Sequence, residues 1–259
     1  MAHITINPTY QHLSDFIESL PSIFETEGEL VYNERNQVRY FTIDGMKLVV
    51  KRFKKPMLHQ RIDYTIIRPS KAKRAYLYGM KLLELGICTP TPIAYIETFC
   101  KGLFCQGYLV TDYCGDPDAR ILREEPEGHD ELLEALVRYL VDCHEKGFIH
   151  GDTNLSNFLY HREGTVYHIT TIDINRSHFS PNPSKKQCLE SLFRLTHVRP
   201  TLKRIVARYA ALRGWDEEAA VDIVLKKLEK FEKRKKMLNY KDRMMLYILL
   251  KCRKILYQL

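Results

Sequence analysis

The sequence contains no apolar run long enough to cross a membrane, since "LYILL" near the C-terminus is far shorter than the roughly 20 residues that a bilayer requires. The start, "MAHITINPTYQHL", has neither the basic segment nor the apolar core of a secretion signal. The seven cysteines match no zinc or redox spacing, even at the neighbours Cys100 and Cys105, so we expect reduced thiols and a cytoplasmic protein. Internal repeats and low-complexity tracts are missing, which excludes solenoid and disordered classes.

What the chain does have is an ample core and an uneven distribution of charge. Hydrophobic residues make up 45% and charged residues 28% of the 259, which is typical of one large globular domain or two lobes. Residues 1–184 hold 20 Lys and Arg against 24 Asp and Glu, whereas residues 185–259 hold 20 against 8. This basic part suits nucleic acid, anionic lipid or a phosphorylated substrate. The alternative is a set of helices with solvated lysines, as in "KKLEKFEKRKKML".

The first third of the chain predicts a five-stranded sheet with one helix. The strands are rich in β-branched and aromatic residues and read "ELVYN", "QVRYFTI", "MKLVVKRF", "TPIAYIETF" and "FCQGYLVTDY". Asp44-Gly45 and Lys101-Gly102 predict tight hairpin turns. Helical spacing of small and apolar residues predicts a helix that begins after Ser70 and ends at Gly86.

After Asp112 the sequence becomes largely helical. Apolar residues at helical spacing predict a buried helix over residues 131–146, closed by Gly147. A strand pair, "FLYH" and "TVYHITTID", turns at Glu163-Gly164, and helices follow from about Lys185. We therefore predict an α+β protein with a β-rich N-terminal lobe (1–111) and a helical C-terminal lobe (112–259).

Polar side chains gather in the loop "IHGDTNLSNFLY", directly after the buried helix. Asp and Asn are common in turns, so a purely structural role is the simplest alternative. Three features oppose it: Lys51 ends an apolar strand, Asp152 and Asn157 lie five apart in the loop, and Asp173 ends a later apolar strand. Phosphoryl transfer requires a cation for the phosphates, oxygen ligands for Mg²⁺ and a carboxylate at the attacking hydroxyl.

In this order, "VVKRF", "HGDTNLSN" and "IDIN" resemble the protein-kinase-like superfamily. The resemblance implies a two-lobed protein-kinase-like fold with a nucleotide cleft between the lobes. The resemblance implies that Lys51 holds the α- and β-phosphates of ATP and that Asp152 orients or accepts the proton of the acceptor hydroxyl. Asn157 and Asp173 would bind Mg²⁺. "LVTDYCG" is similar to the hinge strand, with backbone groups of Asp112 and Cys114 facing the adenine.

Within that superfamily the chain resembles the lipopolysaccharide core-sugar kinases, which phosphorylate Kdo or heptose of the inner core. The residues that carry this are "RPSKAKRAYLYGMKLLELGICTPTPIAYIE", "IHGDTNLSNFLY" and "IDINRSHF". Arg176 would then anchor an anionic acceptor or pair with a local carboxylate. Asn154 would contact acceptor or phosphate, or stabilise the turn, and His150 would support the loop through the backbone.

The sequence also departs from ordinary protein kinases. The turn "YNERNQV" has no glycine, so Asn36, Asn33 or backbone amides would cover the phosphates. The helix after Lys51 lacks the usual Glu, so Asp63 or Glu84 reaches Lys51 or the pair is absent. Asn175 stands where a glycine is usual, which is a mild change because asparagine tolerates left-handed backbone.

The function predicted from the sequence is ATP- and Mg²⁺-dependent phosphorylation of a lipopolysaccharide core or lipid A precursor. The basic tail would meet the anionic inner membrane peripherally, on its cytoplasmic face, and no nucleic acid is expected. Two alternatives are open: an atypical protein serine/threonine kinase of the small tRNA-modification-complex type, and a nucleotide-binding pseudokinase. The sequence identifies neither the sugar and hydroxyl nor the oligomeric state.

Overall fold

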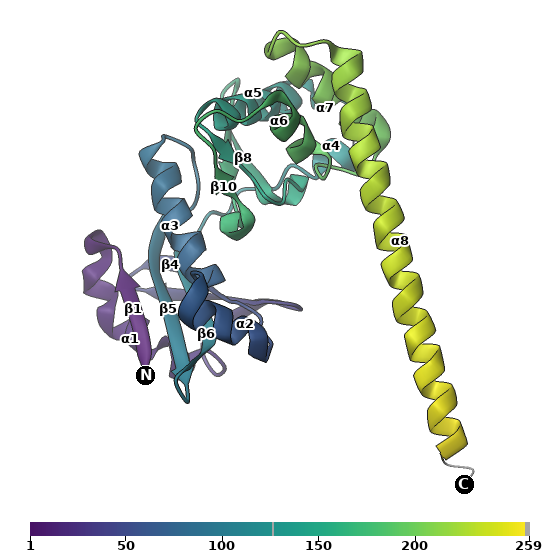
Figure 1. Ribbon diagram of the computed structural model, residues 1–259. Helices are drawn as coiled ribbons and strands as arrows, with labels where there is room; N and C mark the ends of the chain where they lie inside the picture. Colours follow the sequence, from purple (N-terminus) through teal and green to yellow (C-terminus); the bar gives the residue numbers. More distant parts are fainter. Residues whose placement is uncertain (126, 257–259) are drawn as a thin grey trace.

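The computed structural model describes residues 1–125 and 127–256, with side chains up to residue 238. An antiparallel six-stranded sheet forms the first part of the molecule, and helices form most of the second (Figure 1). The strands lie in the order β1-β5-β6-β4-β3-β2. Their bounds are β1 Ala2–Ile6, β2 Glu29–Asn33, β3 Gln37–Ile43, β4 Met46–Arg52, β5 Pro92–Cys100 and β6 Leu103–Asp112.

All five predicted strands are present, but the prediction of five is wrong because β1 adds a sixth at the edge. It pairs with β5 from Ala2 opposite Thr98 to Ile6 opposite Ala94. Both predicted hairpin turns are confirmed, with left-handed backbone at Asp44, Gly45 and their equivalents at residues 101 and 102. The short segment "AHITI" carries little local signal, because its partner lies about 90 positions away.

The hairpin between β5 and β6 also corrects the prediction that all cysteines are reduced. Cys100 and Cys105 form a disulfide across this hairpin, with Cα atoms 5.6 Å apart. The turn at residues 101 and 102 folds the two strands together, so the pairing follows from the hairpin and not from a redox motif. Cys88, Cys114, Cys143 and Cys188 are free thiols.

The alternation of side chains along β4 positions the site. Leu48 and Val50 point into a core beneath α1 (Ser14–Ile23), a helix that the sequence analysis missed and that follows the 3-10 turn η1 (Pro8–Leu13). Val49 and Lys51 point to the opposite face, where they line a cavity. A strand with one buried face and one site-facing face therefore presents Lys51 next to apolar neighbours.

The predicted helix after Ser70 is confirmed as α3 (Lys71–Glu84). The Ser70 hydroxyl accepts a hydrogen bond from the Lys73 N–H at 3.2 Å, and Gly86 ends the helix in left-handed backbone. At Gly79 an added Cβ would lie 2.5 Å from Pro92 of β5, so α3 lies directly against the sheet. The segment between β4 and α3 forms α2 (Leu58–Ile62) and the π-helix η2 (Asp63–Ile67), which were not predicted.

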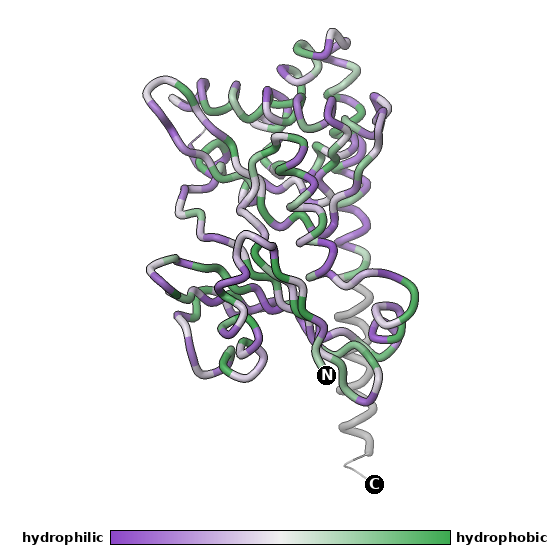
Figure 2. The backbone as a smooth tube through the Cα atoms, turned by 90° about the vertical axis from the view of Figure 1, so that its left-hand side faces the viewer, coloured by the Kyte–Doolittle hydropathy of each residue, from purple (hydrophilic) through white to green (hydrophobic). Residues whose placement is uncertain are grey.

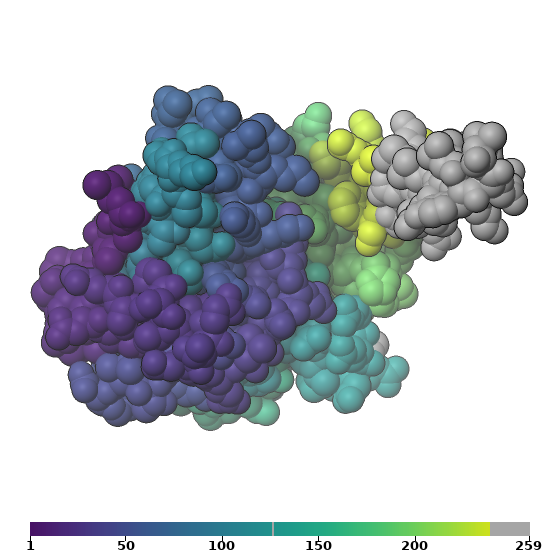
Figure 3. All heavy atoms as spheres, turned by 90° about the horizontal axis from the view of Figure 1, so that it is seen from below, coloured from purple at the N-terminus to yellow at the C-terminus, as the bar shows by residue number. Residues whose placement is uncertain are grey.

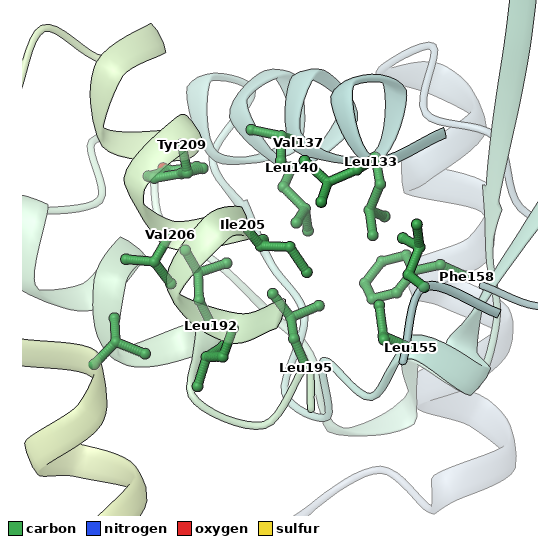
Figure 4. Packing of buried hydrophobic residues seen from close by; sticks show 14 of the residues in the cluster. Leu133, Val137, Leu140, Leu155, Phe158, Leu192, Leu195, Ile205, Val206 and Tyr209 are labelled. Atoms are coloured by element: carbon green, nitrogen blue, oxygen red, sulfur yellow. The ribbon is translucent and has the colours of Figure 1, made fainter. Parts of the chain in front are cut away.

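The second part of the chain is built around α5 (Asp130–Glu145) and α7 (Arg199–Leu212). Figure 4 shows Val137 and Leu140 of α5 facing Ile205 of α7, with Phe158 and its neighbours closing the core. Around this core lie α4 Ile121–Glu124, α6 Lys185–Leu192, the strand pairs β7 Phe148–Ile149 with β10 His178–Phe179 and β8 Phe158–Glu163 with β9 Val166–Thr171, and the 3-10 turns η3 Leu155–Asn157 and η4 Ile174–Arg176.

The last predicted helical segments form one helix, α8 (Glu217–Leu256), which leaves the body and runs past the sheet-bearing part (Figure 1). Hydrophilic residues predominate along α8 before the grey stretch in Figure 2. Among the described residues, no helix combines the length and apolarity that a membrane span needs. The sheet ends at Asp112, the predicted lobe boundary, although the division at that point stays a prediction.

Candidate active site

A cavity of about 530 Å³ lies between the sheet and the helical part, a size typical of small-molecule sites. Apolar side chains from both parts line it, including Val38, Val49, Leu109 and Leu159. Six residues singled out from the sequence also line it: Asn36, Lys51, Asp112, Cys114, Asn157 and Asp173. The fold therefore brings together positions that are up to 137 residues apart in the chain.

The carboxylate that pairs with Lys51 is Asp173, at 2.7 Å between Nζ and Oδ1. The alternative Asp63 pairs with Arg68 instead, at 3.2 Å. Burial alone would raise the pKa of the Asp173 carboxyl, but Lys51, with smaller effects of His150 and Arg176, holds that pKa below its usual value. Asp173 is therefore ionised at neutral pH and carries its charge into the cavity.

The loop before η3 is ordered by hydrogen bonds to its own backbone. The Asn157 amide Nδ2 donates to the Asp152 carbonyl at 2.7 Å. His150 accepts from the Asp152 N–H through Nδ1 at 3.0 Å, and its Nε2 lies 3.0 Å from the Ile172 carbonyl. Burial lowers the pKa of His150, so the neutral ring with its proton on Nε2 satisfies both contacts. This geometry agrees with the predicted role of His150 as a support for the loop. Both ring nitrogens are engaged, so neither is available as a general base.

Asn154 takes part in the turn itself. Its side-chain oxygen accepts from the Ser156 N–H at 3.1 Å, and its own N–H donates to the Asp152 carbonyl at 2.8 Å. Of the two roles considered for Asn154, the structure displays the turn-stabilising contact.

Gly151 explains the form His-Gly-Asp in this loop. A Cβ at this position would lie 2.0 Å from the backbone oxygen of Arg176, which crosses directly over the glycine. Any side chain would therefore push apart the two segments that carry Asp152 and Asp173.

Replacing Gly151 with alanine is expected to destabilise the protein by about 3 kcal/mol, because the clash is with backbone that cannot rotate away. Thermal unfolding followed by circular dichroism should show a fall of about 6–12 °C in Tm. Gly164→Asn is the control, since nothing lies within 4 Å of its Cβ position and asparagine tolerates left-handed backbone. A Tm of Gly151→Ala equal to that of the parent chain would contradict the close crossing.

Two guanidinium groups hold the Asp152 carboxylate. Arg176 Nη1 lies 3.2 Å from one oxygen, and Arg194 Nη2 lies 3.0 Å from the other. Arg176 thus makes the local carboxylate pair that the sequence analysis considered. Arg194 was missed, because it follows α6 in "LFRLTH", where no motif marks it. The Arg194 guanidinium also lies over the Phe231 ring of α8, 5.4 Å from its centre.

Asn175, which stands where a glycine is usual, does not adopt left-handed backbone in the structure. Asp173 does, with φ of 55°. The buried Asn175 amide instead donates to Asp173 Oδ1. Asparagine at this position therefore acts through its side chain, which helps to fix the carboxylate that Lys51 also contacts.

The predicted hinge residues Asp112 and Cys114 and the predicted phosphate-covering residue Asn36 make hydrogen bonds within the protein. The Asp112 N–H donates to the Thr91 carbonyl at 3.2 Å, and the Asp112 carboxylate accepts from the Thr91 N–H at 2.6 Å. Burial raises the pKa of Asp112 despite these contacts. The Cys114 thiol donates to Asp116 at 3.3 Å, and the Asn36 side-chain oxygen accepts from the Lys54 N–H at 3.1 Å.

The donor set fits a magnesium ion that is shared with a nucleotide. The Asn157 amide nitrogen is held by the loop, so its oxygen is the group available to a cation beside the ionised Asp173. Mg²⁺ is commonly bound by one or two protein oxygens together with phosphates and water. Among the residues whose side chains the structure describes, no group of three or more His, Cys, Asp or Glu could by itself hold a metal ion.

Residues 25–212 match the lipopolysaccharide kinase (Kdo/WaaP) family in sequence. The chain belongs to this family. The match spans the cavity, the loop at residues 150–157 and both arginines that hold Asp152. Among curated proteins, none matches the chain in sequence.

A solved structure of WaaP shows the same fold. WaaP in complex with acyl carrier protein has a TM-score of 0.59 at 18% identity, covering 88% of this chain and 98% of that one. WbdD with the kinase inhibitor LY294002 has a TM-score of 0.43 at 18% identity, covering 76% of this chain and 44% of that one. The predicted protein-kinase-like fold is confirmed.

Family membership also establishes the class of activity. The chain is a phosphotransferase of the kinase type that acts on lipopolysaccharide, and such a kinase uses a nucleotide. The alternatives of an atypical protein kinase and a pseudokinase therefore lose their support.

Proposed function

We propose that this kinase transfers the γ-phosphoryl group of ATP to a sugar hydroxyl of the lipopolysaccharide inner core, on Kdo or heptose. The observation that carries the proposal is the contact of Lys51 with Asp173 in the cavity that Asn157 also lines. A cation, oxygen ligands and a neighbouring carboxylate are the groups that phosphoryl transfer requires.

Each side chain has a role that follows from its contacts. Lys51 binds the α- and β-phosphates, and Asp173 and Asn157 would hold Mg²⁺, which neutralises phosphate charge when bound. Asp152 orients the acceptor hydroxyl and accepts its proton. The adenine lies between the apolar cavity walls, facing backbone groups near Asp112 and Cys114. Because the Asp112 N–H is already engaged with Thr91, other backbone groups of this strand end contact the base.

The acceptor is anionic in this proposal, because Arg176 and Arg194 flank Asp152. Each guanidinium has five N–H donors in a fork that matches a carboxylate or phosphate. An acidic group on the sugar would bind these donors and leave its hydroxyl near Asp152. Inner-core sugars that carry a carboxylate or phosphate meet this requirement.

Replacing Arg194 with glutamine is expected to raise the KM for the acceptor about tenfold or more, with the KM for ATP unchanged, because one charge-assisted contact is lost. Steady-state kinetics with each substrate varied in turn would measure this. Arg213→Gln is the control, since Arg213 also lies over an aromatic ring, that of Trp215, away from Asp152. A fall in kcat without any change in the acceptor KM would show that Arg194 only positions Asp152.

Peripheral contact with the anionic inner membrane at its cytoplasmic face is the last part of the proposal. Residues 226–236 of α8 hold seven Lys and Arg against two Glu. Part of this charge pairs within the protein, as Lys227 contacts Glu190 at 2.8 Å. The basic residues of the tail beyond residue 238 lie outside the described side chains.

Mass spectrometry of the lipopolysaccharide core tests the function directly. Cells with the protein should carry one more phosphate on the inner core than cells without it, and fragmentation would assign the sugar. Purified protein with radioactive ATP should label core oligosaccharide. Labelling of protein alone, with an unchanged core, would refute the proposal.

A further inference from the structure

A set of large aliphatic side chains on the segment between β4 and α3 faces outward. Neither α2 nor η2 contains a buried residue. The exposed fractions are 67% for Met57, 63% for Leu58, 42% for Ile62, 76% for Ile66 and 74% for Ile67. We call these five residues the aliphatic patch. Aliphatic groups concentrated in 11 residues in this way are unusual on a protein surface, where such side chains are normally scattered.

The segment is attached to the protein through two polar side chains and one aromatic ring. Arg61 Nε donates to the Phe104 carbonyl at 2.7 Å, and the Thr65 hydroxyl accepts from the Phe104 N–H at 2.9 Å. The Tyr64 ring packs edge-on against the Phe104 ring, with centres 5.3 Å apart. A surface helix normally turns its apolar side inward and its polar side outward. Here the arrangement is reversed, so folding does not account for the aliphatic patch.

Basic residues border the aliphatic patch. Residues 54–74 contain seven Lys and Arg and a single acidic residue, Asp63, which pairs with Arg68. Lys54 and Lys55 are exposed at one end. At the other end a hollow of about 830 Å³ is lined by Arg68, Lys73, Lys101 and the side chains of Ile66 and Ile67, together with the buried Glu97. Aliphatic groups with an excess of cations at both ends match the chemistry of an anionic bilayer surface.

The aliphatic patch is followed in the chain by a residue that lies near the active site. Lys71 follows Ile67 by four positions and begins α3. Burial lowers the pKa of the Lys71 amine, with smaller effects of Arg35, Arg176 and Arg74, whereas Asp173 raises it. Lys71 therefore lies within electrostatic reach of the groups around the proposed acceptor. In Figure 1, α2 points toward the side on which α8 runs, and in the view from below in Figure 3 the blue segment that follows β4 lies at the surface.

We infer that the aliphatic patch and its basic border are a docking surface for an anionic lipid bilayer. The inference rests on the proposed function in one respect: an acceptor anchored in that bilayer would enter the cleft from this side. A folded protein partner fits less well, because a protein interface needs about ten hydrogen bonds and the polar side chains Arg61 and Thr65 face inward. Apolar insertion and electrostatic attraction together supply the two signals that stable membrane binding requires.

Vesicle co-sedimentation tests the docking surface. We expect the full chain to bind phosphatidylglycerol-containing vesicles, to bind pure phosphatidylcholine vesicles weakly, and to dissociate as salt rises. The double substitution Ile66→Ser/Ile67→Ser should lower the partition coefficient about tenfold or more. Lys54→Glu/Lys55→Glu should remove most of the preference for anionic vesicles. Val166→Ser, at an exposed aliphatic residue of β9, is the matched control and should bind as the parent chain does.

The docking surface would be overturned by equal vesicle binding of the serine variant and the parent chain, or by no binding of the parent chain. If the parent chain bound no vesicles but captured an acidic protein that the serine variant did not capture, the surface would be a protein interface instead. An activity assay tests the docking surface separately from the proposed function.

The serine variant should still phosphorylate delipidated core oligosaccharide, and it should lose activity on an acceptor that is embedded in vesicles. Vesicle binding by a chain that phosphorylates neither acceptor would support docking and refute the function.

Discussion

Asp152→Asn is expected to lower kcat by about a thousandfold or more while nucleotide binding is kept, because the amide cannot accept the hydroxyl proton. Asn157 and His150 bind the backbone of residue 152 and not its side chain, so the loop should keep its shape. Kinetics with core oligosaccharide would measure turnover, and the rise of Tm with ATP and Mg²⁺ would measure binding.

A matched control distinguishes loss of the base from loss of charge. Asp142→Asn removes a carboxylate from α5 that pairs with Lys146 on the surface, and should leave kcat unchanged. Arg176 and Arg194 lose a negative partner in Asp152→Asn, so its KM for an anionic acceptor should stay the same or fall. Equal kcat for Asp152→Asn and the parent chain would refute the role of Asp152.

Asp173→Asn is expected to abolish turnover and most of the Mg²⁺-dependent stabilisation by ATP. The substitution removes the charge that would hold the metal and leaves the Lys51 amine without its partner at 2.7 Å. Removing a residue that only orients a metal ligand changes metal affinity by about 10- to 100-fold, so we expect the loss of the Asp173 carboxylate itself to cost about a hundredfold or more in Mg²⁺ affinity. Thermal shift titrations of ATP with Mg²⁺ and with EDTA would separate the metal-dependent part of nucleotide binding from the rest.

Asn175→Ala is a second variant that tests how far Mg²⁺ binding depends on the orientation of Asp173. The Asn175 amide contacts the same Asp173 oxygen, but it would not itself bind the metal. We expect a smaller effect: the concentration of Mg²⁺ that gives half-maximal stabilisation should rise, but by no more than about tenfold. If the Asp173→Asn variant kept the full difference in Tm between ATP with Mg²⁺ and ATP with EDTA, Mg²⁺ would be bound at another site.

The sequence identified most of the elements and the side chains that line the cavity. Lys51, Asp173 and the loop at residues 150–157 each end or follow a strongly patterned element, and such patterns arise from neighbours in the chain. The turn at Asp44-Gly45 was predictable for the same reason, since its backbone depends on those two residues alone.

Contacts between distant segments could not be predicted in this way. The sheet gained β1 through pairing with β5, and Cys100 met Cys105 because a hairpin with a shifted register lies between them. Arg194 reaches Asp152 from beyond α6, across 42 positions that carry no motif. A local pattern holds no information on such pairs.

The sequence by itself determined that this chain carries a strand lysine, a polar loop and a strand-terminal carboxylate in kinase order, because short-range periodicity and turn chemistry fix those elements. Only the tertiary structure decided that Lys51 contacts Asp173, that two arginines hold Asp152 and that the aliphatic patch faces outward. These outcomes depend on which surfaces pack together, and packing joins residues that the chain keeps far apart.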